Sequence, residues 1–179
     1  RLELTLRTRK PPAVHGENGI SIKATEPGYA THYYSMTRLD AEGTINGQSC
    51  TGEAWMDHEF GSAALGKGQQ GWDWFAIQLD NETEIMLYVL RLENGRPDVT
   101  SAGSVVDSDG RVIHIPGGQF RVTPLSRWRS PKSGATYPMR WRVEILPLKV
   151  SLTLQPLMNE QELRTERSTR VTYWEGAVS

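Results

Sequence analysis

The sequence contains a single cysteine, Cys50, which excludes an internal disulfide framework and any zinc site built from cysteines. It lacks an apolar run near the ~18 residues that a helix needs to cross a bilayer, so we expect no integral membrane segment. The formal net charge is only -1, which gives no electrostatic basis for binding nucleic acid or an anionic membrane. Sustained helical periodicity, a G-x-S-x-G hydrolase elbow and a Gly-rich phosphate loop are also missing.

What the sequence does contain is a succession of short β-prone runs joined by turn residues. Runs 72–79 and 85–92 flank D-N-E-T-E, and runs 100–106 and 111–115 flank D-S-D-G, which predicts two hairpins. About ten such runs of even spacing predict an all-β, antiparallel fold. Their meander order favours a lipocalin-like β-barrel, whose interior is wide enough for one small apolar ligand.

The size of the chain suits one domain, or one and a part, because 179 residues with 37% apolar content can bury a real core. Strand-like alternation continues to both ends, from Arg1 and up to Ser179. We therefore expect this chain to be a piece of a longer protein.

The densest chemistry lies between residues 54 and 75. A buried carboxylate is costly unless it is paired or protonated. A run that mixes acids with indoles is therefore either a hydrogen-bonded polar network in the core or the wall of a ligand site. The run holds three tryptophans, three acids and a histidine, namely Trp55, Trp72, Trp74, Asp57, Asp73, Glu59 and His58.

Strand periodicity suggests which of these side chains meet. In the 30–39 run His32 and Tyr34 share one face, and Tyr33 lies on the other. In the next run Trp55 and Asp57 share a face, and in the 72–79 run Trp72 and Trp74 do. If both faces turn inward, an acid, an imidazole, a phenol and an indole meet in an apolar interior, where burial raises the pKa of a carboxyl and suits it to donate a proton. The alternative is a structural network, in which Asp57 accepts hydrogen bonds from Arg38, Arg91 or backbone amides.

The D-H-E triplet at 57–59 does not predict a metal site. Successive strand residues point to opposite faces, so His58 cannot join Asp57 and Glu59 on one ion. We expect no metal and no cofactor. Of the remaining histidines, we expect His15 to be solvent-exposed in a loop and His114 to occupy a strand without a catalytic role.

Several motifs resemble one family over nearly the whole chain. These are Y-Y-S-M-T-R-L, G-E-A-W-M-D-H-E-F-G, G-W-D-W-F-A-I-Q-L, W-R-S-P-K-S-G-A-T-Y-P-M-R-W and Y-W-E-G, in this order. They are similar to the AttH-like predicted secreted hydrolases, which belong with the hydroxyneurosporene synthase (carotenoid 1,2-hydratase) superfamily. The resemblance implies two lipocalin-like barrels in a longer chain. Residues 1–29 would then be the end of a first barrel and an inter-domain segment, and residues 30–179 a second barrel truncated at its C-terminal end.

The resemblance also implies roles for the same four residues. The hydratase branch uses a His-x-aromatic and an aromatic-x-Asp pair, which fall on His32 with Tyr34 and on Trp55 with Asp57. Asp57 would protonate an alkene, the aromatic rings would stabilise the resulting carbocation, and His32 would orient the acid or the water. The hydratases usually have Y-W-D where this chain has W-M-D-H-E, so the substrate does not follow from the resemblance. We expect six further residues to line the ligand site: Trp72, Trp74, His58, Glu59, Arg38 and Tyr88.

Two functions follow as hypotheses. The first is a hydratase or hydrolase, with a cyclase as a variant, acting on an apolar isoprenoid or lipid-like small molecule. The second is a non-catalytic lipocalin-like carrier of such a ligand. A pure interaction domain is a third reading. The resemblance places the protein in a secreted, periplasmic or envelope-associated location, in a bacterium.

Overall fold

β-Strands make up nearly all of the regular structure. The computed structural model of the chain describes residues 1–61, 65–165 and 171–179. These residues form sixteen strands and one short 3-10 helix, η1 (Gly117–Gln119), and no α-helix. Every strand pair is antiparallel, so the predicted all-β antiparallel fold is confirmed. No sheet built from the described residues closes on itself.

The chain divides into two compact units, Arg1–Gly117 and Gly118–Ser179. Strands that precede the expected boundary at residue 29 pair with the long strand that follows it, so they belong to the first unit. The two-barrel division concerns a longer protein and stays a prediction. Within the described residues, no helix is long and apolar enough to span a membrane.

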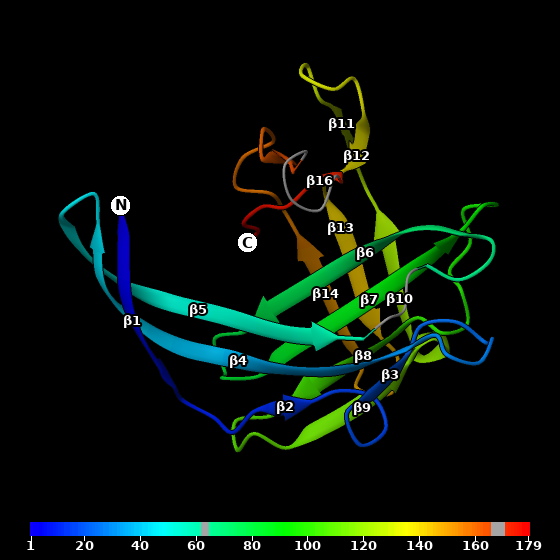
Figure 1. Cartoon of the computed structure of the whole chain (residues 1–179), viewed down its shortest axis with the longest axis horizontal. Coiled ribbons are helices and arrows are strands. Elements are labelled where there is room, and N and C mark those ends of the chain that lie inside the picture. The colour runs from blue at the N-terminus through cyan, green and yellow to red at the C-terminus, as the bar shows by residue number, and fades with distance from the viewer. Residues whose placement is uncertain (62–64, 166–170) are drawn as a thin grey trace. The chain divides into compact units, whose positions relative to one another are not determined.

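One long strand organises the first sheet of unit 1 (Figure 1). Strand β4 (Ala30–Ile45) pairs with three successive short strands along one edge. Along its other edge it pairs with β5 (Gln48–Phe60). The β4–β5 hairpin closes through Asn46 and Gly47, both at positive φ, which suits a two-residue turn. The three strands on the other edge are β1 (Leu2–Thr8), β2 (Ala13–Val14) and β3 (Ile20–Ile22).

The second sheet of unit 1 is a four-stranded meander, in the order β6, β7, β8, β9. Its central strand β7 is buried continuously from Glu84 to Leu90, as expected for a strand covered on both faces. Both predicted hairpins are present in it. The bounds are β6 (Gln69–Gln78), β7 (Glu84–Leu92), β8 (Ala102–Val106) and β9 (Val112–Pro116).

The core of unit 1 lies where β4 and the second sheet meet. Tyr33 of β4 packs with four buried residues of β7 and β8, and Trp55 of β5 covers this cluster. A register shift between Met36 and Leu39 marks a β-bulge in β4, which explains why three successive residues, 37–39, are all buried. The β7 and β8 members of the cluster are Met86, Tyr88, Leu90 and Ala102.

A buried ionic cluster joins the two sheets beside this core. The Glu84 side chain is completely buried, and its carboxylate accepts hydrogen bonds from Lys10 Nζ at 2.8 Å and Arg38 Nε at 2.6 Å. Both cations are nearly buried as well. Such a cluster costs desolvation, which its mutual attraction and hydrogen bonds must offset.

His15 bridges the sheets at a second point, and the expectation that it is exposed is wrong. Its exposed fraction is 1%, because β2 holds it beneath β4. Nε2 lies 2.7 Å from Ser35 Oγ on β4, and Nδ1 lies 3.0 Å from Ser104 Oγ on β8. Burial and then the nearby Lys23 charge lower the pKa of His15 to about 4, so the ring is neutral at pH 7.

Unit 2 is built from shorter strands. A three-stranded sheet runs in the order β10 (Phe120–Pro124), β13 (Trp141–Ile145), β14 (Val150–Leu154). Two hairpin pairs complete it, β11 (Arg127–Arg129) with β12 (Thr136–Pro138) and β15 (Glu162–Arg164) with β16 (Thr172–Trp174). Its core holds Phe120, Met139, Val143, Ile145 and Leu154.

Removing the carboxylate of the ionic cluster should destabilise unit 1 strongly. Glu84→Gln leaves the nearly buried Lys10 without its anion and Arg38 with Glu53 alone. We therefore expect the free energy of unfolding to fall by about 3–5 kcal/mol in urea denaturation. The matched control is Glu42→Gln, whose pair with Arg7 is exposed, and there we expect less than about 1 kcal/mol. Equal losses in the two variants would contradict the importance of the buried cluster.

Stability should also fall in acid because of His15. Its folded pKa of about 4 lies below the ordinary histidine pKa of 6.5, so the unfolded state takes up the proton first as the pH drops. Stability should be full above pH 6.5 and decline towards pH 4, by on the order of 3 kcal/mol for this group. The measurement is the free energy of unfolding against pH, compared with His15→Gln, which should lose this part of the slope. Identical slopes in both proteins would disprove it.

Candidate functional site

An open groove of about 400 Å³ lies in unit 1, between β4–β5 and β6–β7. Five of its twelve lining residues are aromatic, and one lysine and one glutamate lie among them. A concave, largely aromatic surface with few polar groups is typical of a small-molecule site. The lining residues are Lys23, Thr31, Tyr33, Glu59, Phe60, Gly61, Leu65, Gln69, Trp72, Trp74, Tyr88 and Leu90.

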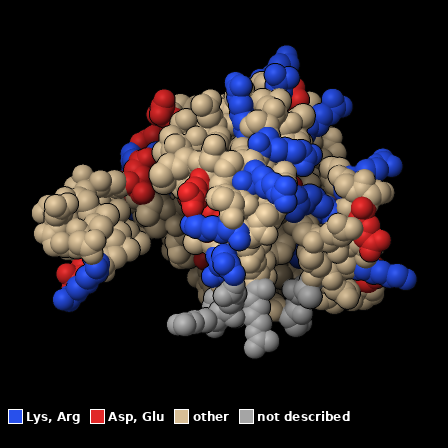
Figure 2. All heavy atoms as spheres, turned by 90° about the horizontal axis from the view of Figure 1, so that it is seen from above, with Lys and Arg blue, Asp and Glu red and all other residues tan. Residues whose placement is uncertain are grey.

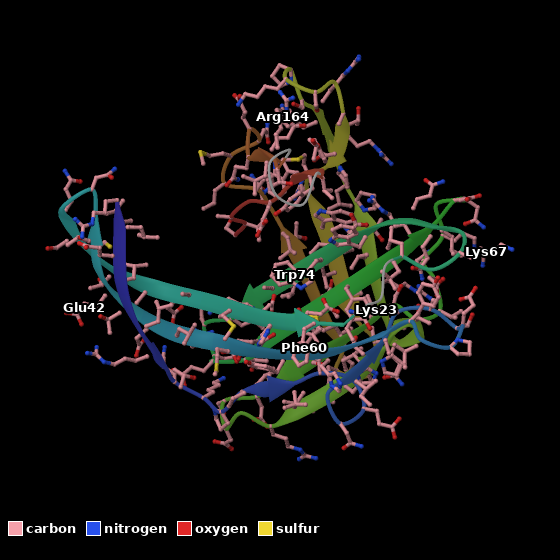
Figure 3. All side chains as sticks on the ribbon, in the orientation of Figure 1. Lys23, Glu42, Phe60, Lys67, Trp74 and Arg164 are labelled. Atoms are coloured by element: carbon pink, nitrogen blue, oxygen red, sulfur yellow. The ribbon has the colours of Figure 1, made fainter. Side chains whose placement is uncertain are left out.

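Strands β6 and β7 supply one wall. Trp72 pairs with Leu90 and Trp74 with Tyr88, so all four side chains share one face of the second sheet. The shared face of the two tryptophans is as predicted from their spacing. The indoles remain 46% and 37% exposed, which leaves apolar surface available to a ligand. Figure 3 shows Trp74 in the region of Phe60 and Lys23, and Glu42 at the far end of the β4–β5 hairpin.

Strands β4 and β5 supply the facing wall. Tyr33 and Glu59 lie directly opposite each other in the β4–β5 ladder. The Tyr33 hydroxyl accepts a hydrogen bond from Trp74 Nε1 at 3.1 Å, which connects the two walls. Burial raises the pKa of Tyr33, and the nearby Asp57 carboxylate raises it further, so this phenol keeps its proton.

Lys23 is the positively charged residue of the groove lining. Its Nζ lies 2.6 Å from Glu59 Oε1, and the same oxygen accepts a 2.6 Å hydrogen bond from Thr31. Nζ also lies 3.9 Å from the centre of the Tyr88 ring and 5.3 Å from that of Tyr33. Burial lowers the pKa of Lys23, and the hydrogen bond to Glu59 acts in the opposite direction.

Asp57 lies on the same sheet face as Glu59, one strand repeat away, but it is exposed and does not line the groove. Trp55 Nε1 donates to Asp57 Oδ1 at 2.8 Å, and Ser35 Oγ donates to the same oxygen. Because the Ser35 proton goes to Asp57, Ser35 Oγ accepts from His15, whose Nε2 therefore carries the hydrogen. A continuous hydrogen-bonded path thus runs from the buried His15 to the exposed carboxylate. The link between Asp57 and the groove is electrostatic, since its carboxylate raises the pKa of the lining residue Tyr33.

The expected meeting of four side chains around Asp57 does not occur. Ser35 is the partner of Asp57, and Tyr34 is the partner of His58, so Tyr34 points to the other face. His32 lies on that outer face too, stacked on Phe60 at 5.2 Å between ring centres. Trp55 and Asp57 do share a face and touch, as predicted. The sequence predicted correctly which residues share a face within each strand, but not which faces of the two strands coincide.

Two of the six expected ligand-site residues lie elsewhere. His58 is exposed on the outer face, where its Nδ1 is 2.9 Å from the Tyr34 hydroxyl. Arg38 is 5% exposed and committed to Glu84, Glu53 and a backbone carbonyl. The other four, Trp72, Trp74, Glu59 and Tyr88, line the groove.

Sequence reasoning missed Lys23 and Tyr33. Tyr33 was assigned to the strand face opposite His32, and that face is the buried one. The alternation of side chains along the strand would therefore have placed Tyr33 beside the Trp-rich run, if the sequence had shown which face turns inward. Lys23 follows the short strand β3, and no local pattern marks a lysine in that position as buried.

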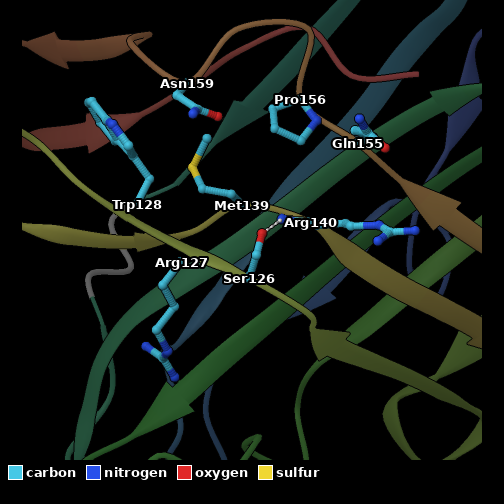
Figure 4. Close-up of a pocket in the computed structure, with 8 residues that line it drawn as sticks. All are labelled: Ser126, Arg127, Trp128, Met139, Arg140, Gln155, Pro156 and Asn159. Carbon is cyan, nitrogen blue, oxygen red and sulfur yellow. Dashed lines mark hydrogen bonds between the residues drawn. The ribbon is translucent and has the colours of Figure 1, made fainter.

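The remaining chemistry is less concentrated. In the described ranges, no group of three His, Cys, Asp or Glu side chains is arranged to hold a metal ion. Figure 2 shows both basic and acidic side chains on the face that it displays. Unit 2 has a smaller cleft of about 270 Å³, where Ser126 Oγ accepts from the Arg140 backbone N–H at 3.2 Å (Figure 4). The cleft is lined by Ser126, Arg127, Trp128, Met139, Arg140, Gln155, Pro156 and Asn159.

Comparison with solved structures places this fold among known proteins. The crystal structure of an AttH protein from Nitrosomonas europaea has 31% identity and a TM-score of 0.89, covering 99% of this chain and 56% of that one. Kievitone hydratase from Nectria haematococca has 17% identity and a TM-score of 0.71, covering 98% of this chain and 54% of that one, and this likeness concerns the fold alone. The chain therefore spans about half the length of either protein.

No curated protein matches the sequence. The AttH-like family model, in contrast, matches residues 1–179, the whole chain. The motifs around Trp55, Asp57 and Trp72, on which the resemblance rested, lie on the two strands that flank the groove. The chain belongs to the AttH-like family.

Proposed function

We propose that this chain forms the ligand-binding and catalytic part of a lipocalin-like enzyme of hydratase or hydrolase type. Its substrate is an apolar, isoprenoid or lipid-like small molecule, and Asp57 is the general acid. The observation that carries the proposal is the aromatic groove in unit 1, one wall residue of which, Tyr33, interacts with the Asp57 carboxylate.

The groove suits an apolar molecule because its walls leave large aromatic surfaces uncovered. Trp72 and Trp74 lie side by side on β6, and Tyr33 and Tyr88 close the interior. Covering exposed indole surface yields about 25 cal/mol per Å² of apolar area. The likeness in fold to kievitone hydratase agrees with a hydratase, and so does membership of the AttH-like family.

The proposed reaction uses the acid and the aromatic wall in sequence. Asp57 transfers its proton to one carbon of an alkene, and the neighbouring carbon becomes a tertiary cation. Water adds to that cation and then releases a proton, which returns to the Asp57 carboxylate. The aromatic wall can hold such a charge, because the Lys23 ammonium already lies 3.9 Å from the centre of the Tyr88 ring. In this scheme His32 and Tyr34, on the outer face, take no direct part.

A specific observation favours a second function, that of a carrier in the cell envelope. Asp57 is exposed and outside the groove lining, and the one carboxylate within the lining, Glu59, is already paired with Lys23. A groove with no unpaired acid can bind an apolar ligand without changing it. The two functions differ in the effect of removing Asp57.

Asp57→Asn should slow turnover strongly. We expect the full-length protein to add water to an isoprenoid alkene such as geraniol, measured by mass spectrometry as oxygen incorporated from heavy-oxygen water. Asp57→Asn keeps the size of the side chain but has no proton to give, so the rate should fall by about 10²–10⁴-fold. Asp109→Asn, at an exposed turn of unit 1, is the control and should keep full activity. Equal rates in the two variants would exclude Asp57 as the acid.

Trp72→Ala should weaken binding of an apolar molecule under either function. The probe is N-phenylnaphthylamine, a neutral dye that fluoresces when it leaves water. Loss of the indole should raise its dissociation constant by about ten-fold, which corresponds to about 1.4 kcal/mol. Trp174→Ala removes an indole from unit 2 instead, and the dissociation constant should be unchanged. A dye that binds both variants as tightly as the parent chain is not bound in the groove.

A further inference from the structure

The charges of the groove are confined to one pair. Among the twelve residues that line it, Lys23 and Glu59 are the only acidic or basic side chains. Their 2.6 Å contact brings opposite charges together, so the groove as a whole is neutral. The Lys23 side chain is only 13% exposed, and two tyrosine rings flank its Nζ. This cation is therefore held by its surroundings and is not a mobile surface lysine.

The hydrogen bonds of the pair leave one acceptor available. Both contacts to Glu59, from Lys23 and from Thr31, go to Oε1. No hydrogen bond between described residues uses Oε2, and the Glu59 side chain is 37% exposed. The side-chain amide of Gln69, which also lines the groove, is occupied by Gly66 N–H and the Lys23 carbonyl. Glu59 Oε2 is therefore open to a ligand at this point of the groove, and a carboxylate oxygen accepts hydrogen bonds but donates none.

Such a site discriminates between polar groups of similar size. A hydroxyl can donate its proton to Glu59 Oε2 while its carbon skeleton lies on Trp72 and Trp74. A carboxylate has no proton to donate, and its charge would meet that of Glu59, already balanced by Lys23. Repulsion between like charges at hydrogen-bonding distance is strong where water is partly excluded. The preference follows from the ion pair, because an unpaired Lys23 would attract the acid instead.

We propose that the groove takes neutral, hydroxyl-bearing apolar molecules and rejects the corresponding carboxylic acids, and that Glu59, held by Lys23 and Thr31, determines this choice. The inference rests on the proposed function, since it concerns what the same groove binds. It adds the chemical class of the ligand, an alcohol or phenol with an apolar body. Glu59 and Lys23 are specificity-determining residues in it, separate from the acid chemistry assigned to Asp57.

The test is displacement of bound N-phenylnaphthylamine by decanol and by decanoate at neutral pH. These competitors have chains of equal length and differ in their terminal group. Decanol should displace the dye at a concentration about ten-fold lower than decanoate. Glu59→Gln should reverse the order, because the freed Lys23 then pairs with the acid. Glu93→Gln removes an exposed negative charge from unit 1 and should leave the order unchanged.

Circular dichroism shows whether each variant is folded, and Lys23→Met provides a second route if Glu59→Gln is not. Without the ammonium, Glu59 should repel decanoate more strongly, so the preference for decanol should grow. Equal displacement by both competitors in the parent chain would overturn the inference and leave the apolar groove standing. An unchanged order in Glu59→Gln, or improved binding of decanoate in Lys23→Met, would also overturn it. Failure of the dye to bind the parent chain at all would overturn the proposed function together with the inference.

Discussion

The register of β4 against β5 is the constraint on which the rest of unit 1 depends. With Ser35 opposite Asp57, the odd-numbered residues before the β4 bulge (31–35) and those opposite them in β5 (57–59) turn towards the second sheet, and His32, Tyr34 and His58 turn away. A shift of one residue would exchange these two sets, because side chains alternate with a period of two. The pairing therefore decides that a phenol and two carboxylates, not imidazoles, face the tryptophans of β6. It also places Ser35 where it can connect the buried His15 to Asp57.

The polar groups between the two sheets help to maintain this register. A purely apolar interface would tolerate sliding, whereas hydrogen bonds and ion pairs are satisfied only in one alignment. Glu84 of β7 reaches Lys10 and Arg38, and His15 reaches β4 and β8 at once. No buried side-chain nitrogen or oxygen in the described part of the chain is left without a hydrogen-bond partner. Complete satisfaction is what makes a buried polar network affordable and specific. The bulge at residues 37–38 also contributes to this network, since it turns Arg38 inward to Glu84.

The extent to which the sequence predicted this structure follows from the range of the interactions involved. Alternation and turn residues are local, and they predicted the all-β class, the two hairpins of the second sheet and the shared face of Trp72 and Trp74. Parity within a strand is local too, so the contact between Trp55 and Asp57 was foreseen. The pairing of one strand with another depends on side chains far apart in the chain, and it separated His32 and Tyr34 from Asp57. Burial of His15 and Lys23 depends on three or more segments, and no local pattern marks it. Closure into a barrel has the same long-range character and is not seen in the described residues.

The two carboxylates of β5 show how identical chemistry on one strand face can serve different ends. Asp57 and Glu59 are two residues apart and point the same way, yet their partners differ. Glu59 is bound by the Lys23 ammonium, and removing this carboxylate would leave Lys23 unpaired in a partly dry groove, which is costly. Asp57 is bound by an indole N–H and a hydroxyl, neutral donors that leave no cation behind when the acid changes its charge. A group that must gain and lose a proton belongs in the second environment, and a group that must keep one charge to select a ligand belongs in the first. Under the proposed function, this difference in partners is the reason why we propose Asp57 for proton transfer and Glu59 for recognition.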